Sequence, residues 1–193
     1  ETGRYNIRVL FGGNNRADMA TVAQINLVSG GISSVYGGGN AGDMRYSEIV
    51  DSLPKWVQDS SVRGFDGWKY QRPRVISTIV HSEDTSRIMV EKVYGGCRMA
   101  NVAGSTILWL SGGVFGYAYG GNDISGDVGT ELGEGSYAVI DHKAVVLQSV
   151  YGGSNGLYHC SKNGRGLGGD AYLLKDRQGK VGGTTNGNIN NSM

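Results

Sequence analysis

The sequence is poor in proline, in cysteine and in excess charge, and each shortage excludes a class of protein. Its 193 residues hold only 2 Pro and 2 Cys. Gly is abundant at 34 residues but does not recur at every third position, so the chain is neither a collagen nor a Pro-rich linker. Lys and Arg number 18, and Asp and Glu 17, without a basic run, which argues against nucleic acid as a partner. No apolar run approaches the roughly 20 residues of a membrane-spanning helix, so we expect no membrane span in this fragment.

Residues that could hold a metal or a cofactor are also few. Cys97 and Cys160 do not form a Cys-x-x-Cys motif, and the sequence fits either one disulfide in a secreted protein or two buried thiols. His81, His142 and His159 are scattered, and we expect each at the surface or in a turn. No Gly-rich phosphate motif opens a helix. The sequence therefore predicts no metal and no cofactor.

A short phrase recurs along the chain: an apolar residue, an aromatic residue and two glycines. The aromatic members of the phrase are Phe11, Tyr36, Tyr94, Tyr119 and Tyr151. Phe11 and Tyr36 are 25 positions apart, and so are Tyr94 and Tyr119. Repetition at a fixed period of this size is typical of stacked architectures.

Two of the repeating units also match in their interiors. Asp18-Met19-Ala20 aligns with Asn101-Val102-Ala103, and Ile25-Asn26-Leu27 aligns with Leu108-Trp109-Leu110. Segments such as Ile7–Phe11 are alternating and β-branched or aromatic, which predicts strands. The sequence thus predicts short strands separated by glycine turns.

The period and the strand pattern together predict an all-β fold, a right-handed parallel β-helix of about 25-residue coils. Equivalent residues of successive coils would then lie roughly 4.8 Å apart, and the five aromatic residues would form a structural ladder. We expect Asn14, Asn122 and Asn155 to form a partial polar ladder beside them. The glycine doublets are expected to supply positive φ angles and to prevent Cβ collisions between coils. A kelch-type propeller has blades near 50 residues, and an ordinary β-sandwich does not explain the matching units.

We interpret residues 1–193 as one domain with an insertion at 45–74. Within the insertion, Ile49, Leu53 and Trp56 share one helical face with their neighbours, which predicts a short helix between residues 47 and 57. The polar, Gly-rich end at 161–193 is expected to be weakly ordered or to cap the repeats.

The segment from Val35 to Met44, Val-Tyr-Gly-Gly-Gly-Asn-Ala-Gly-Asp-Met, resembles the Tyr-Gly-Gly-Gly-Asn repeats of large secreted or surface proteins in gut Bacteroidota. The resemblance covers most of residues 5–44 and 88–160, and leaves out the insertion. It implies a β-helical protein that is secreted or lies at the cell surface. It carries no catalytic motif.

The first functional hypothesis is a non-catalytic extracellular binding or adhesion module whose partner is a glycan or a host or bacterial surface protein. Aromatic rings beside carboxylates are common in such binding sites. The insertion supplies the candidate ligand-binding residues Trp56, Phe65, Asp66, Trp68 and Tyr70.

The alternative is a polysaccharide-active enzyme, a lyase or a glycosidase, built on one face of the β-helix. Glycosidases need two carboxylates about 5 to 9.5 Å apart, and stacked coils could align Asp18, Asp43 and Asp127 in this way. A repeated Asp after a turn also serves to cap backbone N–H groups, which is the competing explanation for these residues.

Overall fold

The computed structural model describes residues 6–45, 48–49, 75–130 and 135–156. Every regular element within these ranges is a strand, so the described part of the chain is all-β. The strands are β1 (Ile7–Phe11), β2 (Ala23–Tyr36), β3 (Glu48–Ile49), β4 (Val75–Tyr94), β5 (Ser105–Tyr119) and β6 (Ser136–Tyr151). The sheet order is β1-β2-β4-β5-β6 with parallel neighbours, and β3 pairs with β4 in the antiparallel sense.

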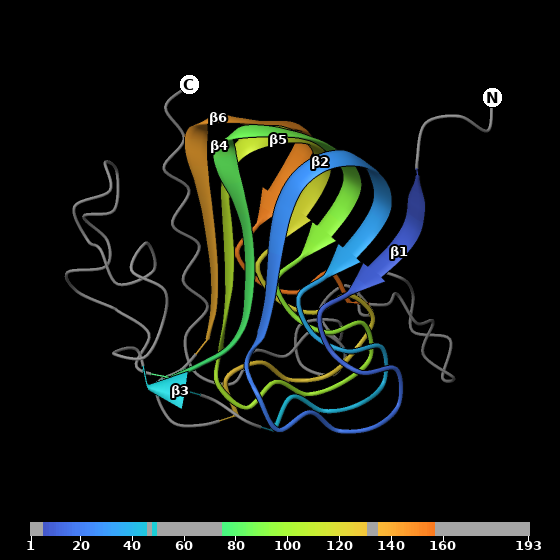
Figure 1. Cartoon of the computed structure of the whole chain (residues 1–193). Coiled ribbons are helices and arrows are strands. Elements are labelled where there is room, and N and C mark those ends of the chain that lie inside the picture. The colour runs from blue at the N-terminus through green and yellow to red at the C-terminus, as the bar shows by residue number, and fades with distance from the viewer. Residues whose placement is uncertain (1–5, 46–47, 50–74, 131–134, 157–193) are drawn as a thin grey trace, which may run out of the picture.

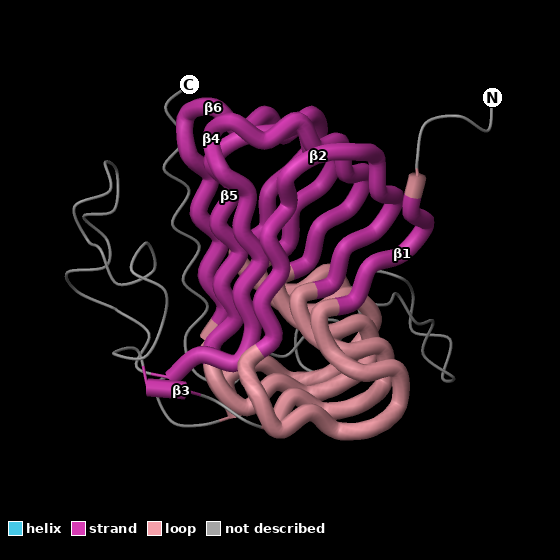
Figure 2. The backbone as a smooth tube through the Cα atoms, in the orientation of Figure 1, coloured by secondary structure: helices cyan, strands magenta, loops and turns pink. Residues whose placement is uncertain are grey.

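Each of the long strands β2, β4, β5 and β6 bends near its middle, which divides it into a first and a second limb (Figures 1 and 2). The loops that follow the second limbs lie side by side at the end of the molecule opposite the bends. At the bend, Gly30 and Gly113 occupy the same register position and have φ angles of 104° and 102°. These values lie in the left-handed region that favours glycine. The sequence predicted separate strands with a glycine turn here, whereas the strand continues through the bend.

The register confirms the equivalences expected from the repeats. Ile25 pairs with Val80, and Val80 with Leu108. The aromatic positions pair in one unbroken series from Phe11 in β1 to Tyr151 in β6. One strand with its following loop is therefore one repeat, and we number the repeats 1 to 5 from β1 to β6, omitting β3.

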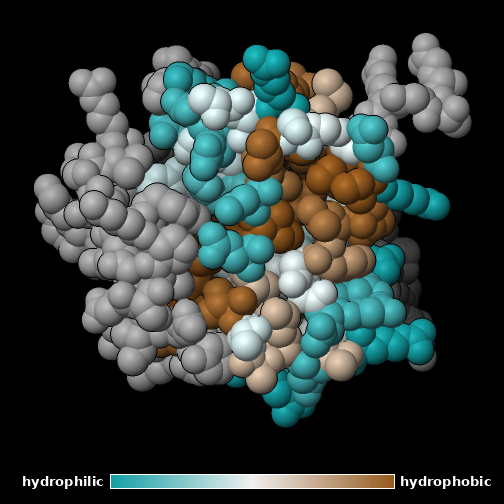
Figure 3. All heavy atoms as spheres, in the orientation of Figure 1, coloured by the Kyte–Doolittle hydropathy of each residue, from teal (hydrophilic) through white to brown (hydrophobic). Residues whose placement is uncertain are grey.

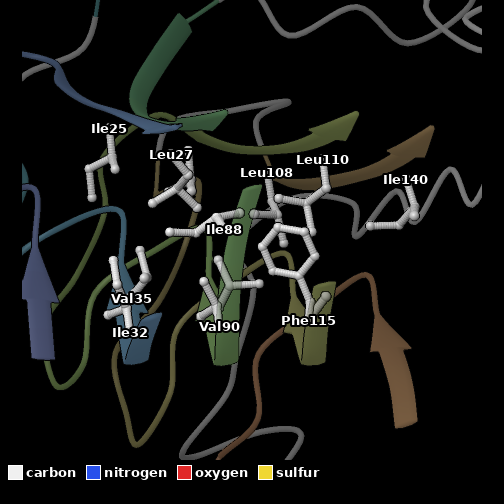
Figure 4. Packing of buried hydrophobic residues seen from close by; sticks show 13 residues of the cluster. Ile25, Leu27, Ile32, Val35, Ile88, Val90, Leu108, Leu110, Phe115 and Ile140 are labelled. Carbon is white, nitrogen blue, oxygen red and sulfur yellow. The ribbon is translucent and has the colours of Figure 1, made fainter. Parts of the chain in front are cut away.

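The main hydrophobic core lies between the two limbs of the strands (Figure 4). The first limbs contribute residues such as Ile25, Leu108 and Ile140, and the second limbs contribute residues such as Val90 and Phe115. Alternate residues of a strand point to opposite faces, so each limb turns every second side chain inward. The loops close the core with a smaller apolar cluster.

A row of buried hydroxyl groups ties the start of β4, β5 and β6 to the glycine turn that follows the same strand. Thr78 Oγ1 donates to the carbonyl oxygen of Gly95 at 2.6 Å, and Ser136 Oγ donates to that of Gly152 at 2.6 Å. Thr106 occupies the same register position and donates to Gly120. These bonds satisfy buried carbonyl groups that would otherwise destabilise the core.

The glycine doublets are required by close backbone approach and not by positive φ. None of the glycines that directly follow the five aromatic residues has a positive φ, so that part of the expectation is wrong. A Cβ atom on Gly37 would overlap the carbonyl oxygen of Gly95, and one on Gly95 would overlap that of Gly120. The N–H of Gly37 donates to Tyr94 O at 2.9 Å, so the ladder of hydrogen bonds between repeats continues into the turn.

The predicted helix is wrong where the structure describes it. Glu48 and Ile49 form β3 and pair with Ile76 and Val75 of β4. Pairing with β4 gives these residues backbone hydrogen bonds to another strand, and this tertiary pairing outweighs the local helical pattern. The rest of that segment and the end at 161–193 lie outside the described residues.

We expect Gly37→Ala to destabilise the protein by at least about 2 kcal/mol, because the added methyl group has no room beside the Gly95 carbonyl. Gly30→Ala is the comparison: its Cβ meets only one atom, at 4.0 Å, so its cost of about 1 to 2 kcal/mol comes from backbone strain. Urea denaturation followed by circular dichroism measures both. An unchanged midpoint for Gly37→Ala would contradict the close-approach explanation.

Candidate functional site

The insertion that carries the predicted ligand-binding residues starts and ends at one place on the sheet. Ile49 pairs with Val75, and Glu48 pairs with Ile76, so the described residues on either side of 50–74 lie on adjacent, paired strands. Ile76 is fully buried, which fixes this base in the core. The candidate residues themselves, Trp56, Phe65, Asp66, Trp68 and Tyr70, lie outside the described residues.

The three carboxylates of the enzymatic alternative lie in a single row along the loops. Asp18 Oδ1 accepts the backbone N–H of Asp43 at 3.1 Å, and Asp43 Oδ1 accepts that of Asn101 at 2.9 Å. Asn101 Oδ1 in turn accepts the N–H of Asp127 at 2.9 Å. The side chains of Asp18, Asp43 and Asn101 therefore each cap the backbone of the next repeat, which is a structural role.

Asp18 has a second partner in addition to the backbone. Its Oδ2 lies 2.6 Å from Nε of Arg45, and both side chains are exposed. An exposed ion pair of this kind contributes little to stability, but it occupies the remaining carboxylate oxygen. An amide replaces the carboxylate at Asn101 in the same row, so the row needs an oxygen acceptor and not a negative charge.

The five aromatic residues stack as one column. Successive ring centroids are 4.9, 4.9, 4.8 and 4.9 Å apart, and the planes differ by 13°, 3°, 9° and 7°. The rings pack as a cluster separate from the main core. Tyr36, Tyr94 and Tyr119 are buried in the column, whereas Tyr151 at its end is exposed.

Asp123 lies beside this column and connects several repeats. Its Oδ2 accepts a hydrogen bond from the Tyr36 hydroxyl at 2.9 Å, although Tyr36 belongs to repeat 2 and Asp123 to repeat 4. Asp123 Oδ1 accepts from Asn155 Nδ2 of repeat 5 at 2.9 Å. One carboxylate thus links three of the five repeats.

The column and Asp123 hold the tyrosine hydroxyls in the protonated form. Burial raises the pKa of Tyr36 and of Tyr94 well above 10, and the negative charge of Asp123 raises both further. Burial also raises the pKa of Tyr119. Arg98 opposes the shift at Tyr36 because its positive charge favours the phenolate.

The polar ladder beside the column differs from the predicted one. Asn40 Nδ2 donates to Asn15 Oδ1 at 2.8 Å, and Arg98 donates to Asn40 Oδ1 at 3.2 Å. Asn15, Asn40, Arg98, Asp123 and Asn155 each lie four residues after the aromatic of their repeat. The prediction combined Asn14 and Asn122, three residues after the aromatic, with Asn155. Counting from the aromatic residue would have found the correct row.

Two further groups can now be placed. His81 is buried in β4, which contradicts its expected place at the surface or in a turn, and it packs edge-on against Trp109 with centroids 6.1 Å apart. Burial lowers the pKa of His81.

Cys97 is a buried free thiol whose pKa burial raises to about 12, so it stays a thiol near neutral pH. His159 and Cys160 lie outside the described residues.

Comparison with protein-family models, with curated proteins and with solved structures found no match to this chain. In the described part of the chain, no group of three or more His, Cys, Asp or Glu side chains is arranged to hold a metal ion. No helix among the residues described is long and apolar enough to cross a membrane. The site must therefore be interpreted from its own geometry.

We expect stability to fall as pH rises above about 10, the ordinary tyrosine pKa. Below that pH, Tyr36 and Tyr94 are protonated in both the folded and the unfolded chain. Above it, the unfolded chain loses these protons and the folded chain keeps them, so each tyrosine lowers the free energy of unfolding by roughly 1.4 kcal/mol per pH unit.

Urea denaturation between pH 8 and 11.5, with tyrosinate absorbance recorded in parallel, measures this loss. Tyr36→Phe removes one titrating group, so we expect a shallower alkaline decline together with about 1 kcal/mol lower stability at pH 8, where its hydrogen bond to Asp123 is lost. Equal slopes for the two proteins would contradict the assignment.

Proposed function

We propose that this chain is a right-handed parallel β-helix that serves as a non-catalytic extracellular binding or adhesion module. The partner is a glycan or a host or bacterial surface protein, and residues 45–74 provide the contact. The observation that carries the proposal is the pairing of β3 with β4, which attaches the aromatic-rich segment to a rigid sheet at a single base.

The β-helical arrangement is supported by the bonds between loops as well as between strands. Met19, Met44, Val102 and Val128 form successive parallel bridges within the loops. The loops therefore stack in the same register as the strands (Figure 2). Parallel strands connected in this way are right-handed in almost all known cases.

A non-catalytic role is supported by how the repeated carboxylates are used. Asp18 and Asp43 both accept backbone N–H groups, and Asp18 also pairs with Arg45. A glycosidase instead needs one carboxyl group that is free to donate a proton and another that is free to attack or to activate water. The scaffold thus supplies rigidity, and the insertion supplies the variable chemistry.

The composition of the insertion favours a partner that presents flat apolar surfaces beside polar groups. Sugar rings and protein surfaces both do so, and aromatic residues bind them with little loss of conformational entropy. Within the insertion, Trp68 and Tyr70 are two positions apart and Asp66 precedes them. The resemblance to secreted or surface repeats supports a location outside the cell.

We expect the double variant Trp68→Ala/Tyr70→Ala to lose at least about tenfold in affinity for the partner, which corresponds to the loss of about 1.4 kcal/mol. The measurement is a glycan and surface-protein array followed by titration of the strongest binder. Lys69→Ala is the matched control, because it lies between the two aromatic residues. Undiminished binding by the double variant, with an unchanged circular dichroism spectrum, would overturn the assignment to the insertion.

The enzymatic alternative has its own test. We expect the wild-type protein to release no reducing or unsaturated ends from a panel of acidic and neutral polysaccharides. If it does release them, the triple variant Asp18→Asn/Asp43→Asn/Asp127→Asn distinguishes the two roles. Asn101 already serves in this row, so amides preserve the fold. Activity that disappears in the folded triple variant would establish the carboxylates as catalytic.

A further inference from the structure

Large apolar side chains are exposed mainly on the first and the last strand of the stack. They include Ile7 and Val9 on β1, and Val145, Leu147 and Tyr151 on β6. In Figure 3 apolar atoms reach the surface over the region where β1 and β2 lie in Figure 1. Exposed apolar surface of this extent on a protein commonly marks an interaction site.

For Tyr151 and Ile7 the exposure follows from position in the stack, whereas Val145 shares its register position with Met89 of the internal strand β4, which is also exposed. Tyr151 is 47% exposed, whereas Tyr119 at the same register position one repeat earlier is 8% exposed. Ile7 is 43% exposed, whereas its partner Ile32 is 5% exposed. Among the described residues, Tyr119 and Ile32 are each covered by a neighbouring repeat on both sides, whereas Tyr151 and Ile7 have such a neighbour on one side only.

Strand β1 and the second limb of β6 carry little charge and no proline, and charge and proline are two of the features that protect strand edges. Residues Ala144–Tyr151 of β6 contain no charged residue and no proline, and β1 contains Arg8 as its one charge. Protective edges carry lysines, prolines or bulges that turn the edge away. Along this limb the β6 edge is uncharged, and its pairing with β5 has one register shift, between Val146 and Ser149.

The edges of β1 and β6 are the two complementary sides of one kind of interface. Inside the molecule that interface is made four times, each time with one stacked aromatic pair and parallel backbone hydrogen bonds. We propose that the β6 edge of one molecule pairs in parallel with the β1 edge of a second copy. Phe11 then stacks on Tyr151, Leu10 packs on Val150, and Ile7 packs on Val146.

This contact is heterologous, because it joins two different surfaces of the same chain. A heterologous contact that advances along the stack axis does not close, so it generates linear assemblies of molecules and not a symmetric dimer. The repeats would continue from one copy to the next, and each copy would present its insertion along the assembly.

A disulfide tests the register directly. Val9 and Ser149 occupy one register position, at opposite ends of the series Val9, Ser34, Lys92, Tyr117, Ser149. Within one molecule they lie four strand spacings apart, roughly 19 Å, which is too far for a disulfide. Between stacked copies they would be neighbours at about 4.8 Å. The variant Val9→Cys/Ser149→Cys, made with Cys160→Ser, should therefore form a ladder of covalent multimers under mild oxidation.

The control is Val9→Cys/Glu91→Cys in the same Cys160→Ser background, because Glu91 is exposed but lies in the middle strand β4. We expect the end-to-end pair to give about tenfold more covalent multimer than the control, which corresponds to a tenfold difference in the association constant. Equal yields from the two pairs would overturn the proposed register.

A second measurement needs no change to the cysteines. Sedimentation velocity over a wide range of protein concentration should show assembly of the wild-type chain. Tyr151→Lys should weaken it about tenfold, since a charged edge residue replaces a stacked ring. Val28→Lys is the matched control: Val28 is 67% exposed on β2, and the change should leave assembly unaltered. A wild-type chain that stays monomeric at every concentration, with no end-to-end cross-link, would overturn the proposal and assign the cover of these edges to the same chain or to another protein.

Discussion

The structure depends on how closely successive backbones approach at the aromatic-Gly-Gly turn. The first glycine of each internal doublet lies against the carbonyl oxygen of the next repeat's glycine, where any side chain would collide. This approach lets the glycine N–H continue the hydrogen-bonded ladder beyond the strand. The aromatic residue just before it is then held at the strand spacing, which is why ring centroids repeat at 4.8 to 4.9 Å. Register, ring stacking and loop stacking all follow from this one contact.

Polar side chains in such a stack take the roles that the repeated spacing gives them. A short side chain with an oxygen acceptor can reach the N–H of the residue one repeat further on, as Asp18 and Asp43 do. Asp123 is different, because its carboxylate reaches across repeats to the hydroxyl group of the buried Tyr36. Hydrogen bonds to a charged group are stronger than those between neutral groups. Asp123 therefore fixes the column in a way that stacking alone does not.

The period of the sequence predicted which residues share a register position, and little else about geometry. It placed Ile25 with Leu108 and Met19 with Val102, because equal spacing within a repeat leaves no other alignment. It did not show that the chain bends at Gly30 without leaving the strand, since a glycine marks either a turn or a bend. The helical pattern near Ile49 was misleading, because pairing with β4 is a long-range contact that no local window contains. The reach of Asp123 to Tyr36 spans 87 positions and depends on stacking that the period implies only indirectly.

The location of the candidate site follows from the similarity of the repeats. Five repeats use nearly the same residues for the same contacts, so the repeats themselves have little capacity to encode a specific partner. Specificity must then come from the places where the period is broken. The interval from Tyr36 to Tyr94 is 58 positions, against 25, 25 and 32 for the other intervals, and most of its extra residues stand between β3 and β4 in the sequence. A rigid, self-similar scaffold can accept such an insertion because each repeat is stabilised mainly by its two neighbours. The exposure of Ile7 and Tyr151 follows from the same property: in a stack stabilised by nearest neighbours, a side chain is covered only where another layer lies over it.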